Sequence, residues 1–97
     1  MKSAAAILFA GVLLAGCSKP DPQAQLKRGT EFLAAKKYHE AIIELSSALQ
    51  TDPRLAEARI KLADAYLATN NGSGALGELV RAADLRPADT ELQLRAG

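Results

Sequence analysis

A 34-residue internal repeat constrains the fold of this chain more than any other feature of its sequence. When the sequence is shifted by 34 positions, small residues fall on small ones, aromatic on aromatic and proline on proline. The aligned pairs are Lys27 and Lys61, Gly29 and Ala63, Phe32 and Tyr66, Leu33 and Leu67, Ala34 and Ala68, Ala41 and Ala75, Glu44 and Glu78, Leu45 and Leu79, Ala48 and Ala82, and Pro53 and Pro87. A period of this length indicates one supersecondary unit that buries its apolar face against its own copies.

The spacing of apolar residues within each unit predicts helices. Alanine and leucine recur at steps of three and four residues, in the sets Ala41, Leu45, Ala48 and Ala75, Leu79, Ala82. Such steps place the residues on one stripe of a helix, and the alternation that strands need is absent from the pattern. Gly29 and Ala63 leave room for two helix backbones to approach closely, while Phe32 and Tyr66 are expected to fill the gaps beside them.

Chain breakers fall where pairs of helices need turns. Asn70-Asn71-Gly72 supplies residues that tolerate positive φ, and Ser73 is expected to cap the helix that follows. Pro53 and Pro87 are each expected to end a second helix and to mark the turn into the next unit. Because the first unit has Tyr38 where the second has a glycine, we expect the second turn to be looser.

Residues of these types at this period resemble the tetratricopeptide repeat (TPR), a helix–turn–helix unit. The resemblance implies an all-α fold, an α-solenoid of helical hairpins, with units at 23–55 and 56–89 and an incomplete third unit at 90–97. In that third unit Glu91 repeats Glu57. Because about three units are usually needed for stability, we expect the chain to be a fragment of a longer array.

The first sixteen residues have the pattern of a cleaved signal peptide. Lys2 is followed by an uncharged apolar stretch, residues 4–15, which is shorter than the roughly 20 apolar residues that cross a bilayer core. The stretch ends in Leu14-Ala15-Gly16-Cys17, which resembles the lipobox of bacterial lipoproteins. The resemblance implies cleavage after residues 1–16, a diacylglyceryl thioether on the sulfur of Cys17, and acylation of the new amino terminus by a fatty acid such as palmitate.

The expected lipid would hold the mature chain on a membrane. Three acyl chains exceed what stable anchoring needs, and residues 17–22, which include two prolines, are interpreted as a short tether. Ser18, where some lipoproteins have aspartate, implies by the same resemblance an outer-membrane, periplasm-facing protein of the cell envelope. The alternatives are an ordinary secretory signal with a chance cysteine and a buried apolar helix.

Composition and residue types argue against several classes of function. Lys and Arg number 12 against 11 Asp and Glu, and without Lys2 the mature part is formally neutral, which does not favour nucleic acid. Cys17 is the sole cysteine and His39 the sole histidine, so we expect no disulfide, no metal site and no catalytic pair. Gly72-Ser73-Gly74-Ala75-Leu76-Gly77 spells G-x-G-x-x-G, but no strand precedes it, and we interpret it as a hairpin turn. We therefore expect no enzyme activity, no cofactor and no small-molecule substrate.

The remaining candidate site is a groove that binds other proteins or peptide segments. In TPR proteins the first helix of each unit lines the inner face, and the resemblance places there Leu26, Thr30, Leu33, Glu57, Ile60, Asp64 and Leu67, with Leu94 as a further candidate. Leucines and Ile60 suggest an apolar floor for a helix or extended segment, and Glu57 and Asp64 favour a basic partner. The alternative is that the leucines pack against further repeats.

Three hypotheses for function follow from the sequence. The segments Gly16-Cys17-Ser18-Lys19, Leu26-Lys27-Arg28-Gly29 and Ala41-Ile42-Ile43-Glu44-Leu45 resemble the opening of the TPR lipoproteins found with exosortase/PEP-CTERM systems, which implies a scaffold in protein sorting or exopolysaccharide export. The second hypothesis is a pilotin-like or outer-membrane-assembly lipoprotein. The third is the recruiting module of a larger lipid-anchored enzyme, and the full-length gene would separate the three.

Overall fold

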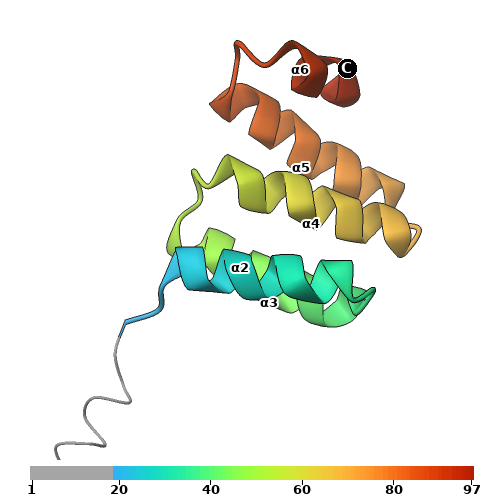
Figure 1. Ribbon diagram of the computed structural model, residues 1–97. Coiled ribbons are helices and arrows are strands. Elements are labelled where there is room, and N and C mark those ends of the chain that lie inside the picture. Colours follow the sequence, from blue (N-terminus) through green and yellow to red (C-terminus); the bar gives the residue numbers. More distant parts are fainter. Residues whose placement is uncertain (1–18) are drawn as a thin grey trace, which may run out of the picture.

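The computed structural model describes residues 19–97, and this part of the chain is helical and contains no strand (Figure 1). Its helices are α2 (Pro22–Ala34), α3 (Tyr38–Thr51), α4 (Ala56–Ala68), α5 (Gly72–Leu85) and α6 (Thr90–Ala96). The predicted all-α fold is confirmed. The predicted signal peptide, the lipidated Cys17 and Ser18 lie outside the described residues.

The helices form two hairpins and the first helix of a third, stacked in chain order (Figure 1). α2 packs against α3, α4 packs against α5, and α6 packs against α5. α4 is the central element, since it also contacts both helices of the first hairpin. This position explains why α4 buries five residues, Ala56, Ala58, Leu62, Ala63 and Ala65, on more than one face.

The core consists of two clusters, each of which combines the helices of one hairpin with the first helix of the next unit. The first contains Leu26, Ala41, Leu45, Ala48, Leu49, Ala58, Leu62 and Ala65. The second contains Ala63, Ala75, Leu79, Ala82, Ala83 and Leu92. Tyr66 packs against both clusters, and Phe32 packs against the first, as predicted for the aromatic positions of the repeat. Burial of apolar surface between successive hairpins, rather than inside one globule, stabilises the chain.

At Gly29 the backbone of α2 lies close to α3. A Cβ atom added to this glycine would lie 2.6 Å from Cγ of Leu45, a side chain with no exposed surface. The second hairpin has Ala63 and Leu79 at the equivalent positions, and both are buried. The prediction that small residues permit close backbone approach is therefore confirmed, and the first hairpin is the tighter of the two at this point.

Both hairpin turns use a left-handed residue at the same repeat position. Lys36 has φ 62° and Asn70 has φ 63°, and positive φ at Asn70 confirms the predicted turn. The predicted cap was wrong: Asn71, not Ser73, precedes α5, and its side chain accepts a hydrogen bond of 2.9 Å from the backbone N–H of Gly74. Asn71 directly precedes α5, so its short side chain can reach a free N–H group in the first turn. Ser73 already lies inside the helix and is not at the capping position.

Prolines and capping side chains determine where the other helices begin and end. α3 ends at Thr51 and α5 ends at Leu85, each two residues before the proline that was predicted to stop it. α2 begins at Pro22, the last residue of the expected tether, because proline fits the first position of a helix. Asp21 caps α2 by accepting a bond of 3.0 Å from the N–H of Gln23. Among the helices described, none is both long and apolar enough to cross a membrane.

Candidate protein-binding surface

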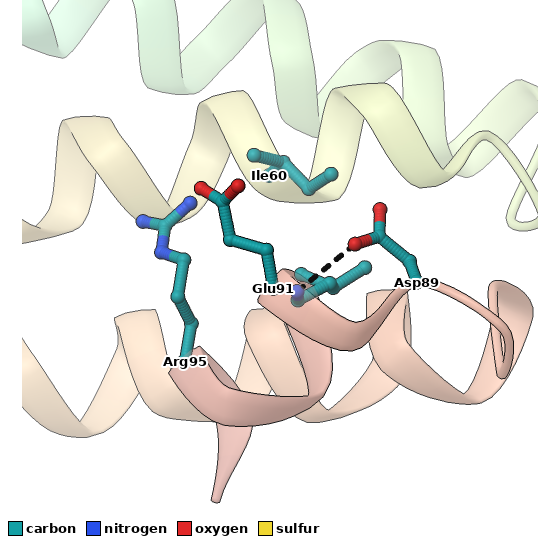
Figure 2. Close-up of a pocket in the computed structure, with 5 residues that line it drawn as sticks. Ile60, Asp89, Glu91 and Arg95 are labelled. Carbon is teal, nitrogen blue, oxygen red and sulfur yellow. Dashed lines mark hydrogen bonds between the residues drawn. The ribbon is translucent and has the colours of Figure 1, made fainter.

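A shallow depression of about 200 Å³ lies between α4 and α6, the first helices of two successive units. Its lining residues are Ile60 from α4 and Asp89, Glu91, Leu92 and Arg95 from α6 and its cap. Figure 2 shows Glu91 and Arg95 extending from α6 towards α4, where the Ile60 side chain lies. The depression therefore combines an apolar floor with a charged rim.

Two of the charged groups at this depression are held by the fold itself. The guanidinium of Arg95 donates to Oδ1 of Asp64 across 3.1 Å, which ties α6 to α4. The carboxylate of Asp89 accepts a bond of 3.1 Å from the N–H of Leu92 and so caps α6 (Figure 2). The predicted groove residue Asp64 is thus neutralised from within the chain.

Glu91 lines the depression, whereas Glu57 lies on α4 three residues before Ile60 and is not one of the lining residues. Both are exposed, both lie in the first turn of their helices, and neither forms an ion pair within residues 19–97. They occupy the same position of the 34-residue repeat, on α4 and α6, the first helices of two successive units. Glu57 shares a helix face with Ile60, three residues further on. Both glutamates therefore carry unpaired negative charge on the helices that flank the depression.

The groove residues predicted in the first unit lie elsewhere. Leu26 is only 6% exposed and belongs to the first core cluster, together with Ala58 and Leu62 of α4. The hydroxyl of Thr30 donates to the carbonyl of Leu26 at 2.8 Å, and Leu33 is half-buried against the same cluster. For the two leucines, the alternative of packing against the next repeat is the one that the structure supports. A partner cannot contact Leu26 in this arrangement.

The predicted residues of the second unit lie on two different surfaces. Ile60 lines the depression between α4 and α6, whereas Leu67, 51% exposed, borders a second depression beside α5. Sequence reasoning missed Asp89, Glu91 and Arg95 as surface residues of this site. The signal that could have found Glu91 was present, because it repeats Glu57 at the period of the units. Leu94, at the repeat position of Ile60, is 77% exposed.

The described residues contain no arrangement suited to metal binding or to the phosphate chemistry of a glycine-rich loop. Between residues 19 and 97, no three His, Cys, Asp or Glu side chains come together in a way that could hold a metal ion. The glycines of the G-x-G-x-x-G spelling lie within α5, and the N–H of Gly74 is already bonded to Asn71. His39 is exposed on the first turn of α3.

Comparison with known families gives the class of protein. Residues 32–96 match the family described as the tetratricopeptide repeat, and the chain belongs to that family. A search of curated proteins finds no match. The tetratricopeptide repeat is typically a module for protein interaction rather than catalysis, so the described region is a helical scaffold that binds other proteins.

Proposed function

We propose that this protein is an envelope lipoprotein whose TPR units recruit a partner protein at the membrane. Cys17 carries the lipid, and the mature chain faces the periplasm from the outer membrane. The lipobox-like Leu14-Ala15-Gly16-Cys17 behind an apolar leader supports the anchor. The stacked hairpins support the recruiting role, because they present an interaction surface.

The observation that carries the recruiting role is the depression between α4 and α6. Its floor is Ile60, and the exposed carboxylates of Glu57 and Glu91 stand on the two helices beside it. A helix or extended segment with one bulky apolar residue and flanking Lys or Arg would match this floor and rim. Because Asp64 is already paired with Arg95, the recognition charge would come from the two glutamates.

The partner system that we propose is one for PEP-CTERM/exosortase-linked protein sorting or exopolysaccharide export. The resemblance of the segments around Cys17, Gly29 and Leu45 to the opening of the TPR lipoproteins of those systems supports it. In a strain that carries such a system, deletion of the gene should leave PEP-CTERM proteins incorrectly sorted. Normal sorting in the deletion strain would reject this assignment while leaving the scaffold role intact.

The anchor is tested by fractionation of cells that express the Cys17→Ser variant. We expect this variant to leave the membrane fraction and to lose labelling by a fatty-acid analogue, because no thioether can form. Ser18→Asp is the matched control, since it keeps the cysteine and should remain on a membrane. Persistent membrane association of Cys17→Ser would exclude the proposed anchor.

The recruiting surface is tested by cross-linking and pull-down from a periplasmic extract. Ile60→Asp places a charge on the apolar floor and should abolish capture of the partner, and Glu57→Lys with Glu91→Lys should weaken it by charge reversal. Ile43→Asp is the control, because Ile43 is 64% exposed on α3, outside this depression. Unchanged capture by Ile60→Asp would show that the partner binds elsewhere.

A further inference from the structure

The first helices of the second and third units carry the same pair of charges at the same repeat positions. Glu57 and Glu91 lie in the first turns of α4 and α6, and Lys61 and Arg95 follow them one helical turn later. α2 has the neutral Gln23 at the position of the glutamates. The surface between α4 and α6 therefore has an acidic edge at the first turns of the two helices and a basic edge one turn further on.

The two edges differ in how far the fold already satisfies their charges. Arg95 is paired with Asp64 at 3.1 Å, whereas neither glutamate forms an ion pair within residues 19–97. Lys61 is half-buried, while both glutamates are exposed. A ligand can therefore pair with the acidic edge without displacing a contact of the fold, and the charge of that edge calls for a basic ligand.

This surface does not depend on the segment that follows α6. One unit earlier, α2 contacts α3 and α4, and among the helices described it does not contact α5. A helix at the next repeat position of α5 would accordingly lie away from α4. The depression over Ile60 and the glutamates that flank it would stay accessible in a longer array.

The spacing of the two glutamates selects the form of the ligand. Ala63 of α4 and Leu92 of α6 belong to one core cluster, and helices that pack through their side chains have axes roughly 8–10 Å apart. Glu57 and Glu91 are related by this one step between successive units. An extended chain in the polyproline II form advances about 9 Å in three residues and presents residues i and i+3 on one side. Basic residues three positions apart in such a chain would therefore face both glutamates together.

A helical ligand fits this surface less well than an extended one. A helix with its side chains is about 10–12 Å across, whereas the depression between α4 and α6 has a volume of about 200 Å³. Figure 2 shows the Glu91 side chain extending from α6 towards α4, where Ile60 lies. A space of this size accommodates a single apolar side chain, which an extended chain can insert between its two basic residues.

We propose that the surface between α4 and α6 binds an extended segment of a partner protein in which two basic residues stand three positions apart with a bulky apolar residue between them. The basic side chains pair with Glu57 and Glu91, and the apolar side chain lies on Ile60. Lys61 and Arg95 repel basic residues from the other edge and so fix the side on which they bind. This inference rests on the proposed recruiting function and specifies the sequence that the surface recognises.

The test measures fluorescence anisotropy with the full chain in detergent and three labelled peptides of identical composition. Each contains two lysines, one leucine and one proline among glycine and serine, with the leucine between the lysines and the lysines two, three or seven positions apart. Spacing seven represents the helical alternative, since seven residues of a helix span about 10.5 Å. We expect spacing three to bind about twofold to fivefold more tightly than the others, because a misplaced lysine loses one exposed charge pair.

An exchange of charges shows which glutamate meets which lysine. Glu57→Lys should be rescued by glutamate in place of one lysine of the peptide, and Glu91→Lys by glutamate in place of the other. Glu40→Lys is the matched control, because Glu40 is also an exposed glutamate in the first turn of a helix and lies on α3, outside the depression. This control should leave the preference for spacing three unchanged.

Three results would overturn the inference: equal binding of the three peptides, tightest binding at spacing seven, or rescue of both variants by the same peptide. Circular dichroism of each variant separates a lost charge pair from a lost fold. The recruiting function has its own test in the capture of a partner from the extract, which depends on Ile60 and not on the spacing of lysines in a peptide. A flat response to spacing alongside capture that Ile60→Asp abolishes would reject this inference and leave the recruiting function standing.

Discussion

The turns of the two hairpins reach the same backbone geometry from different residues. Lys36 and Asn70 occupy one repeat position and have φ of 62° and 63°. Asparagine tolerates this left-handed conformation because its short side chain can bond locally, whereas a lysine pays the steric cost of its Cβ. The helix after the second turn is capped by the Asn71 side chain, and the helix after the first turn has no side-chain cap. The first turn is therefore imposed by the packing of its hairpin rather than by its own residues.

The two hairpins also differ in how they are covered. The first is covered by α4, and Leu45 has no exposed surface, whereas its repeat partner Leu79 is 6% exposed and lines the depression that Leu67 also borders. A leucine at one repeat position thus has two environments, and a sequence pattern cannot distinguish them. Contacts with the neighbouring helices, and not residue type alone, therefore set how completely each leucine is buried.

We expect the largest loss of stability from Leu45→Ala, which tests the difference in burial between Leu45 and Leu79. Its side chain is fully buried between Gly29 and the helices around it, so truncation should leave a cavity and lower the free energy of unfolding by about 2–5 kcal/mol. Leu79→Ala should cost about 1 kcal/mol less, because its site is already open on one side. Urea unfolding of both variants, followed by far-UV circular dichroism, measures the difference. Equal losses would contradict unequal burial of the two units.

The next largest effect is expected from Gly29→Ala. Alanine is the better helix former by about 1 kcal/mol, but its Cβ would meet Leu45, and relieving such overpacking costs about 1–3 kcal/mol. We expect a net loss of about 1–2 kcal/mol in the free energy of unfolding. The control is Ala63→Gly, which removes a Cβ at the same repeat position of the second hairpin and should destabilise through helix propensity. A stabilised Gly29→Ala variant would show that the first hairpin is not the tighter one.

Sequence alone predicts the elements of this fold because the repeat reports packing directly. Small residues at Ala41 and Ala48 and their partners in the second unit indicate close helix contacts, and the structure buries them. The cap at Asn71 was missed because two capping residues, Asn71 and Ser73, stand on either side of Gly72, and only the backbone geometry chooses between them. The left-handed Lys36 was missed because lysine carries no signal for positive φ.

The candidate surface was predicted less well than the fold, for a physical reason. Leu26, Ile60 and Leu94 stand at one repeat position, yet the first is buried, the second half-buried and the third exposed. Leu26 belongs to the cluster that α4 helps to form, and Ile60 packs against the cluster that contains Leu92, so exposure at this repeat position depends on neighbours in space rather than on residue type. Contacts between units, such as Arg95 with Asp64, involve side chains distant in sequence and leave no local pattern.

A smaller effect is expected at the ion pair that joins α4 to α5 within the second hairpin. Arg59 donates through Nη1 to Glu78 at 2.8 Å and through Nη2 to the carbonyl of Pro53 at 2.9 Å, which fixes the turn between units against α5. Its side chain is 15% exposed, so Arg59→Ala should cost about 1–2 kcal/mol, and added salt should recover little of that loss. Arg28→Ala is the matched control, because Arg28 is 52% exposed beside Glu44 and should contribute at most about 0.5–1 kcal/mol. Similar losses for both variants would show that the lower exposure of the Arg59–Glu78 pair adds nothing to its contribution.

The smallest effect, and the one of opposite sign, is expected at the first turn. Lys36→Gly removes the Cβ that makes φ of 62° unfavourable and should raise the free energy of unfolding by about 0.5–1 kcal/mol. Asn70→Lys installs the lysine of the first turn in the second and should lower it by a comparable amount. Thermal unfolding midpoints of the two variants should move in opposite directions, and a shift in the same direction would contradict the assignment of strain to Lys36.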